Sequence, residues 1–599
     1  MDITSIETAY RNRGVSPVNV VRDIFRAIRR QGERPIWITL VDEENAIERA
    51  RELESVSDPG ALHLYGVPFA VKDNFDVMGL PTTAGCPAYS RQAAHTAEAV
   101  RRLMDAGAIL IGKTNMDQFA TGLVGTRTPY GICSSVFDER YISGGSSSGS
   151  AVAVAKGLVS FALGTDTAGS GRVPAAFNNL VGMKPTRGLV STDGVLPACR
   201  SLDCVSVFAE TCSDAYRVLH VIRGFDSKDA YSRAAGPGEG ATPWAAGGFN
   251  FGIPSDESLE FFGDELARES YEEAIDALTR MSGTPVRFDY SSFRAAADLL
   301  YCGPWVAERF AAVGEFAEAN AEAMDPTVAR IVAGGNRFSA VDAFMAEYRL
   351  TEIRRRTDRI LESVDFLLLP TAATIYTIAQ IEASPVELNT NLGYYTNFVN
   401  LLDMAAVAVP AGMRKDGLPF GVSIVGEAFT DDGLLAMADR LHRELAITLG
   451  GSERLLSETP PLPVDATPNA CVLMAVVGAH LTGQPLNWQL TSRKARFVRT
   501  VRTHADYRLY VIPGATPAKP GLVYSPGFAG AGIELEIWAM SEDTVGSLLN
   551  RIPAPLSLGT VRLEDGSSVK GFLCEPSGIV GAEEISHLGG WRAYVGSHR

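Results

Sequence analysis

Serines in glycine-rich surroundings are the residues of this sequence that could do covalent chemistry. The stretch SGGSSSGSAVAVAKG, residues 143–157, carries several of them, and LGTDTAGSGRVPA places Ser170 in a glycine-lined loop. The small residues Ala168 and Gly169 let the main chain approach a substrate, and consecutive N–H groups of such a loop can converge on one developing negative oxygen. The pattern predicts that Ser170 attacks a carbonyl group and that the main chain holds the resulting oxyanion.

Lys72 is the candidate base for this serine. A bare serine hydroxyl is a poor nucleophile and needs a base, and no histidine lies near Ser170 in the sequence. Lys72 ends the apolar run GVPFAVK, so burial would favour its uncharged form and lower its pKa. An uncharged lysine can accept a proton, and a second serine can pass that proton on.

Two other motifs compete with this interpretation. GSSSG, residues 145–149, matches a nucleophile elbow centred on Ser147, but a poor buried strand precedes it and the nearest following histidine, His220, lies in a helical pattern. GAILIGKT, residues 107–114, matches the phosphate-loop pattern, but the apolar residues between its glycines are typical of a strand. Lys113 is therefore interpreted as a structural residue. The serine-rich stretch alone also fits a linker or a helix cap.

The elements that must position these residues alternate along the chain. Apolar runs predict strands at 64–73, 108–115 and 158–167, and helical spacing predicts helices at 96–107 and 148–157. Alternation of this kind predicts an α/β fold with a mixed, mostly parallel sheet covered by helices.

Composition excludes several classes of partner. With 54 Lys and Arg against 70 Asp and Glu, the net charge is −16, which argues against non-specific binding of nucleic acid or an anionic membrane. The N-terminus lacks the pattern of a signal peptide, so a cytoplasmic location is expected. Cysteines and histidines are scattered without the spacing of a metal site, and we expect no metal and no cofactor.

A proline-rich stretch near residue 460 marks a domain boundary. We expect a large domain at 1–455, a linker at 456–467 and a small α+β domain at 468–599, because prolines disfavour helix and give a semi-rigid spacer. In the small domain His480 is the best catalytic candidate, although a lone histidine in an apolar strand is more often structural.

Taken together, these motifs resemble the amidase signature family of serine hydrolases over about residues 20–445. The resemblance implies a Ser–cis-Ser–Lys triad in which Lys72 is the base, Ser146 the bridging serine after a cis peptide, and Ser170 the nucleophile. It also implies an oxyanion hole of the N–H groups of residues 167–170, with Ala168 where many members have glycine. The matching stretches are GVPFAVKDNFDV, GLPTTAG, AGAILIGKTNMDQFA, GGSSSGS, GTDTAGSGRVPA and GLPFGVSIVG, and the oxyanion-hole residues are Thr167, Ala168, Gly169 and Ser170.

Within the family, the stretches at 115–131, 300–310 and 392–404 are most similar to members that hydrolyse allophanate, a urea nitrogen bearing a carboxylate. This similarity implies that Gly122, Tyr301 and Arg309 contact the substrate, since arginine can grip a carboxylate with two hydrogen bonds. From the sequence alone, Tyr301 and Arg309 are better explained as a packed aromatic residue and its surface partner.

The same similarity implies an activity and partners. The activity is hydrolysis of allophanate to ammonia and carbon dioxide in urea or s-triazine nitrogen catabolism, through an acyl-enzyme. The small domain would have a fold like γ-glutamyl cyclotransferase and would either assist decarboxylation of the first product or help assembly. A homodimer is expected, with a separate urea carboxylase supplying the substrate. Three alternatives stay open: an amidase of another small carboxylated amide such as malonamate, the amidase subunit of a glutamine amidotransferase, and a non-catalytic binding protein.

Overall fold

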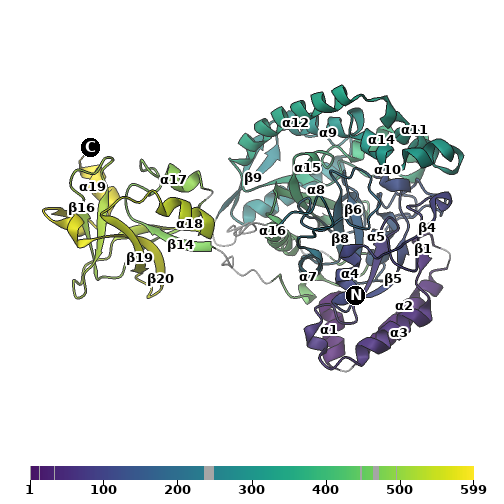
Figure 1. The fold of residues 1–599 in the computed structure, drawn as a ribbon, viewed down its shortest axis with the longest axis horizontal. Helices are drawn as coiled ribbons and strands as arrows, with labels where there is room; N and C mark the ends of the chain where they lie inside the picture. The colour runs from purple at the N-terminus through teal and green to yellow at the C-terminus, as the bar shows by residue number, and fades with distance from the viewer. Residues whose placement is uncertain are drawn as a thin grey trace. The chain divides into compact units, whose positions relative to one another are not determined.

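The computed structural model describes residues 2–598 except 13, 33, 235–247, 446–447, 463–470 and 494. The chain forms two compact units, one containing the described residues up to 462 and the other those from 471 on (Figure 1). The part of the expected linker that is described, residues 456–462, begins with the short 3-10 helix Leu456–Glu458. Residues 463–467 of that linker lie outside the described residues.

The first unit is built on an eleven-stranded sheet, with strand order β1-β5-β2-β6-β8-β7-β12-β13-β11-β9-β10. Its central strands are buried along their whole length, which explains their apolar sequences. The strands are β1 (Trp37–Leu40), β2 (Pro68–Lys72), β5 (Ile109–Thr114), β6 (Phe161–Asp166), β7 (Val181–Lys184), β8 (Cys204–Ala209), β9 (Phe249–Pro254), β10 (Gly283–Phe288), β11 (Phe366–Pro370), β12 (Met404–Met413) and β13 (Pro419–Glu427).

The sheet is mixed, as expected, but the expectation that most of it is parallel is wrong. β2 runs parallel to β5 and β6, and β9 runs parallel to β10 and β11. The other pairs, which include all those from β6 through β8, β7, β12 and β13 to β11, are antiparallel. β12 and β13 are joined by a short turn, and such a connection can join only antiparallel strands.

Helices pack against this sheet. One buried apolar cluster joins α2, α3 and α5 to the strands around β2, and another joins α9, α12 and α15 to β11, β12 and β13. The helices predicted at 96–107 and 148–157 are present as α4 and α5. Among the described residues, no helix is long and apolar enough to cross a membrane. The helices of this unit are α1 (Ile3–Arg11), α2 (Pro17–Arg30), α3 (Glu43–Glu54), α4 (Glu98–Asp105), α5 (Ser148–Ala155), α6 (Val173–Phe177), α7 (Cys212–Ile222), α8 (Glu265–Arg280), α9 (Ser291–Cys302), α10 (Val306–Ala319), α11 (Pro326–Gly334), α12 (Ala340–Leu361), α13 (Ile378–Ala383), α14 (Glu387–Leu392), α15 (Phe398–Leu401) and α16 (Asp431–Glu444).

The second unit is rich in β-structure and has its own core. A five-stranded sheet, ordered β15-β18-β14-β20-β19, accompanies a three-stranded sheet, ordered β17-β16-β21. Side chains of both sheets and of α19 meet in one buried apolar cluster. The elements are β14 (Cys471–Val476), β15 (Arg496–Arg502), β16 (Tyr507–Val511), β17 (Pro520–Tyr524), β18 (Glu534–Ser541), β19 (Leu556–Arg562), β20 (Ser568–Cys574), β21 (Glu583–Glu584), α17 (Trp488–Thr491), α18 (Glu542–Leu549) and α19 (Trp591–Ser597).

Candidate active site

The carboxyl ends of β2 and β6 bring together residues that are far apart in the sequence. These strands are neighbours and run parallel, so their ends meet at one edge of the sheet. Lys72 is the last residue of β2, and the loop carrying Ser170 follows β6. Ser146 reaches the same place from the turn that precedes the buried helix α5.

The three side chains form an unbroken path of polar contacts. Nζ of Lys72 lies 2.8 Å from Oγ of Ser146, which lies 3.0 Å from Oγ of Ser170. All three residues are at most 2% exposed, and the peptide bond between Gly145 and Ser146 is cis. Both distances suit proton transfer along the path from Ser170 to Lys72.

Burial makes Lys72 a plausible base near neutral pH. The pKa of Lys72 is lowered to about 7: desolvation lowers it most and the charge of Arg309 also lowers it, while Asp117, Asp203 and Asp166 act in the opposite direction. Nζ of Lys72 contacts the hydroxyls of Ser146 and Thr165, each at 2.8 Å, and makes no ion pair with a described carboxylate. An amine so placed exists in substantial amount as the uncharged form that can accept a proton.

The loop at 167–170 presents its main chain to the same place. Its N–H groups donate to no acceptor in the described part of the chain, so they are free to hold a substrate oxygen. Gly169 has φ +147°, and a Cβ there would lie only 2.4 Å from Oγ1 of Thr396. Glycine is therefore required at this position both for its backbone conformation and for space.

Buried acidic groups anchor both ends of this loop. Asp166 forms a two-pronged ion pair with Arg172, at 2.9 Å for each contact. Burial alone would raise the pKa of Asp166, but the Arg172 guanidinium lowers it below the ordinary value. Asp203 accepts hydrogen bonds from the Thr167 hydroxyl and from main-chain N–H groups at Ala198 and Cys199. The loop is thus held on side chains from β6 and from the segment before β8.

Arg309 and Tyr301 lie together, as their assignment to one ligand requires. Arg309, on α10, is 2% exposed, and its Nη2 donates to the Tyr301 hydroxyl at 3.3 Å. Nη1 donates to Oγ1 of Thr121 at 2.8 Å and to the carbonyl oxygen of Ala120 at 3.3 Å. These bonds use three of the five N–H donors of the guanidinium. Arg309 forms no ion pair with a described carboxylate, which is unusual for a buried charge.

Asp117 connects the Gly122 segment to the serine turn. Its carboxylate accepts N–H bonds from Val124, Gly125 and Arg127, and its own N–H donates to the carbonyl oxygen of Ser146 at 3.1 Å. Gly122 has φ +153°, and a Cβ there would lie 2.8 Å from the Asp117 carboxylate. Contacts therefore run continuously from Arg309, through residues 120–122 and Asp117, to Ser146.

Four residues of this site were missed by the sequence reasoning. Thr165 contacts Lys72, Asn74 donates to Thr165 at 3.4 Å, and Asp117 and Asp203 hold the two loops. Thr165, Asn74 and Asp117 lie inside the motifs that pointed to the family, so their positions could have been inspected. Nothing in the local sequence indicates Asp203.

The competing motifs lead elsewhere. Lys113 is a buried residue of β5, where its ammonium contacts Asp73 at 3.1 Å and donates to the carbonyl oxygen of Pro81 at 2.7 Å. His220, on α7, contacts Asp432 at 3.2 Å. Neither a phosphate loop nor a Ser–His pair is formed by these residues.

His480 lies in the second unit, in the turn after β14. Its Nε2 is 3.0 Å from Oε1 of Gln489, and its ring stacks on Phe572 at 5.0 Å. Burial lowers the pKa of His480, and the residue lines a small pocket that also includes Lys519 and Arg551. The histidine is therefore uncharged at neutral pH and borders a cavity with two basic residues.

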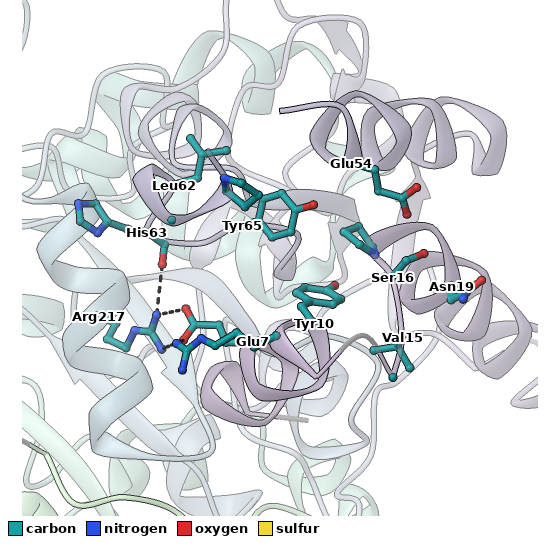
Figure 2. A pocket seen from close by; sticks show the side chains of 15 residues that line it. Glu7, Tyr10, Val15, Ser16, Asn19, Glu54, Leu62, His63, Tyr65 and Arg217 are labelled. Carbon is teal, nitrogen blue, oxygen red and sulfur yellow. Dashed lines mark hydrogen bonds and ion pairs between the residues drawn. The ribbon is translucent and has the colours of Figure 1, made fainter. Parts of the chain in front are cut away.

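A pocket in the first unit lies away from the serines. It has a volume of about 750 Å³ and lies among α1, the start of α2 and the segment before β2, with Tyr10, Tyr65 and the Glu7–Arg217 ion pair on its walls (Figure 2). None of the residues of the proposed relay lines it. The buried polar contacts, and not this pocket, point to the chemistry.

Both units of the chain match known protein families. The amidase family matches residues 20–435, and the allophanate hydrolase C-terminal domain matches residues 472–596. The structure of Kluyveromyces lactis allophanate hydrolase superposes with a TM-score of 0.78 and 39% identity, covering 100% of this chain and 99% of that one.

Two curated relatives place the chain in a wider context. Urea amidolyase of Saccharomyces cerevisiae is 42% identical over 93% of this chain, but the match covers 31% of that protein, so the chain spans about a third of its length. A glutamyl-tRNA(Gln) amidotransferase subunit of Agathobacter rectalis is 30% identical, covering 73% of this chain and 93% of that protein. The chain therefore belongs to the amidase family of hydrolases that act on carbon–nitrogen bonds, and it carries an allophanate hydrolase C-terminal domain.

Proposed function

We propose that this enzyme hydrolyses allophanate to ammonia and carbon dioxide, with Ser170 as nucleophile, Ser146 as bridging serine and Lys72 as base. The single observation that carries the proposal is the contact path of 2.8 and 3.0 Å from Lys72 to Ser170, with the buried cation of Arg309 connected to it. Allophanate offers one group to each: an amide carbonyl to the serine and a carboxylate to the arginine.

The first step forms a tetrahedral intermediate on Ser170. Uncharged Lys72 takes a proton from Ser146 as Ser146 takes one from Ser170, and Oγ of Ser170 bonds to the terminal amide carbon. Negative charge develops on the carbonyl oxygen, where N–H groups of residues 167–170 stabilise it. One such donor typically lowers the activation free energy by about 3 kcal/mol. The loop therefore matters as much to the rate as the base does.

The second step releases the products. The lysine, now an ammonium, returns its proton through Ser146 to the leaving nitrogen, and ammonia departs as the carbon–nitrogen bond breaks. Water, deprotonated by the same relay, then attacks the acyl-enzyme and frees Ser170. The product is N-carboxycarbamate, which loses carbon dioxide and yields the second ammonia.

Arg309 supplies the preference for a carboxylated amide. Its charge is buried without a described carboxylate as partner, and a buried charge in this situation is strongly destabilising. An anionic substrate that bonds to its remaining N–H donors removes that cost. Tyr301, which already accepts from Arg309, and Gly122, beside Thr121, complete the proposed carboxylate site.

The second unit acts on the first product in this proposal. His480, Lys519 and Arg551 border one pocket, and two basic side chains suit a doubly charged product such as N-carboxycarbamate. We place the amidase domain at 1–455, the linker at 456–467 and the C-terminal domain at 468–599.

A homodimer and a separate urea carboxylase complete the proposal. The curated relative called urea amidolyase is about three times as long as its match to this chain. We infer that carboxylation of urea, where urea is the source of allophanate, is carried out by another polypeptide or segment.

The experiment is steady-state ammonia release from allophanate, urea, malonamate and glutamine, measured side by side on the wild type and on Ser170→Ala. Allophanate should be strongly preferred, and the variant should fold normally and lose the activity. Preference for malonamate or glutamine would reassign the substrate, and retained activity in Ser170→Ala would refute the nucleophile.

A further inference from the structure

A threonine hydroxyl that lies against the proposed oxyanion loop has no hydrogen-bond partner. Thr396 is in the turn between α14 and α15, and the residue is 0% exposed. Its Oγ1 bonds to no other group among the described residues. A buried hydroxyl without a partner lowers the stability of a folded chain. A partner that arrives with the substrate would offset that cost.

The hydroxyl borders the free N–H donors of the loop. A Cβ placed on Gly169 would lie 2.4 Å from Oγ1 and 2.8 Å from Cβ of Thr396, so this side chain is in direct contact with Gly169. Gly169 precedes Ser170, and the N–H groups of both residues donate to no acceptor in the described chain. In the proposed reaction these N–H groups hold the substrate carbonyl oxygen. The Thr396 hydroxyl therefore lies at the edge of the place where that oxygen is held.

Side-chain contacts fix the turn that carries Thr396. Nη2 of Arg172 donates to the carbonyl oxygen of Thr396 at 3.2 Å, and the same guanidinium pairs with Asp166 at the start of the loop. Asn400, on α15, donates to the carbonyl oxygen of Asp166 at 2.8 Å. The turn and the loop are thus held on one buried ion pair. A donor fixed in this way need not reorganise when charge develops in a reaction, which is the condition for strong stabilisation.

Ser206 provides a comparison on the same loop. Its Oγ is also buried without a partner among the described residues, and a Cβ on Gly171 would lie 2.5 Å from it. However, the N–H group of Gly171 donates to Asp166 at 3.1 Å, and Ser206 is paired with Gly164 inside the sheet. Ser206 therefore borders an N–H group that the protein already uses, whereas Thr396 borders one that is free for a substrate.

We propose that the Thr396 hydroxyl donates a hydrogen bond to the substrate carbonyl oxygen as negative charge develops on it, and so adds a side-chain donor to the oxyanion hole. A hydroxyl can donate or accept. Here it lies beside the N–H groups that converge on the oxygen, and not beside Ser146, which protonates the leaving nitrogen. The inference rests on the proposed function, because it uses acyl transfer to Ser170. It does not depend on which amide is the substrate, since every amide carbonyl develops this charge.

The test is steady-state ammonia release by three variants. Thr396→Val removes the hydroxyl and keeps nearly the same shape against Gly169, Thr396→Ser keeps the hydroxyl, and Ser206→Ala is the matched control. Thr396→Val should lower kcat about 100-fold, the effect typical of one lost oxyanion donor. It should change KM less than about threefold, because the bond strengthens only in the transition state.

The other two variants separate the hydroxyl from the shape of the side chain. Thr396→Ser should stay within about tenfold of the wild-type kcat, because it keeps the donor. Ser206→Ala should stay within about twofold, because it removes only an unpartnered hydroxyl that faces the protein. For the same reason, neither Thr396→Val nor Ser206→Ala should lower the temperature of thermal unfolding, which is measured on each variant.

Two substrates separate this inference from the substrate assignment. With allophanate and with one uncharged amide, Thr396→Val should lose kcat by the same factor, since both form the oxyanion. Preference of the wild type for the uncharged amide would refute allophanate as substrate and leave that factor unchanged. A kcat of Thr396→Val within about threefold of the wild type, a loss confined to KM for allophanate, or equal inactivity of Thr396→Ser and Thr396→Val would each overturn the role of the hydroxyl.

Discussion

Two replacements of Arg309 separate its role in substrate recognition from its effect on the pKa of Lys72. Arg309→Gln removes the charge and keeps a polar side chain, whereas Arg309→Lys keeps the charge and loses the planar fork. The wild-type arginine is 2% exposed and contacts Thr121 and Tyr301. Both variants should therefore lose recognition of the substrate carboxylate, but only the glutamine should change the electrostatics around Lys72.

The size of the first effect follows from the hydrogen bonds that are lost. A hydrogen bond to a charged group contributes about 1.5–3 kcal/mol, and two of them therefore about 3 kcal/mol or more. Since 1.4 kcal/mol corresponds to a factor of ten, kcat/KM for allophanate should fall at least about 100-fold in both variants. The loss should appear mainly as a higher KM, and an uncharged amide should be affected far less.

The second effect is a shift in the pH profile. The positive charge of Arg309 lowers the pKa of Lys72, so removing it in Arg309→Gln should raise that pKa. Because activity requires the uncharged amine, the acid limb of kcat/KM should move to higher pH in Arg309→Gln and stay near its wild-type position in Arg309→Lys.

The assay is ammonia release across a pH series, with allophanate and one uncharged amide as substrates. Thermal unfolding of each variant controls for damage to the fold. An equal loss on both substrates would refute carboxylate recognition, and an acid limb that moved to lower pH in Arg309→Gln would refute the electrostatic coupling to Lys72.

The other predictions concern the base, the loop and the second unit. In the wild type, kcat/KM should rise as pH increases through about 7, because burial holds the pKa of Lys72 near that value; a profile flat from pH 5 to 9 would exclude Lys72 as the base. Gly169→Ala should lower kcat by roughly 100-fold or more, because the added Cβ would displace Thr396 or the N–H donors of the loop. Ala168→Gly should keep activity. Steady-state kinetics with a folding control measures both variants. His480→Ala should leave the first release of ammonia unchanged and slow the release of carbon dioxide, with both products measured on the same samples. Equal slowing of both releases would show that His480 does not act on the decarboxylation.

Much of the fold could be read from local patterns. β2, β5, β6, α4 and α5 all appear where apolar periodicity and a terminal glycine predicted them. Strand direction in the middle of the sheet could not be read in this way, because it depends on which segments pair. β7 and β12 are neighbours although more than 200 residues separate them in the sequence, and local spacing carries no information about that pairing.

The sequence by itself determined which residues could take part: a lysine at the end of an apolar strand, a serine-rich turn before a helix, and a serine in a glycine loop. It also determined the family, because these motifs follow one another in the order that is typical of the amidase signature family. Only the tertiary structure decided that Thr165 touches Lys72, that Asp117 and Asp203 hold the loops, and that Arg309 is buried with no described carboxylate at ion-pair distance. The physical reason is that hydrogen bonding within an element is local, whereas desolvation and charge pairing depend on every segment that packs around a group.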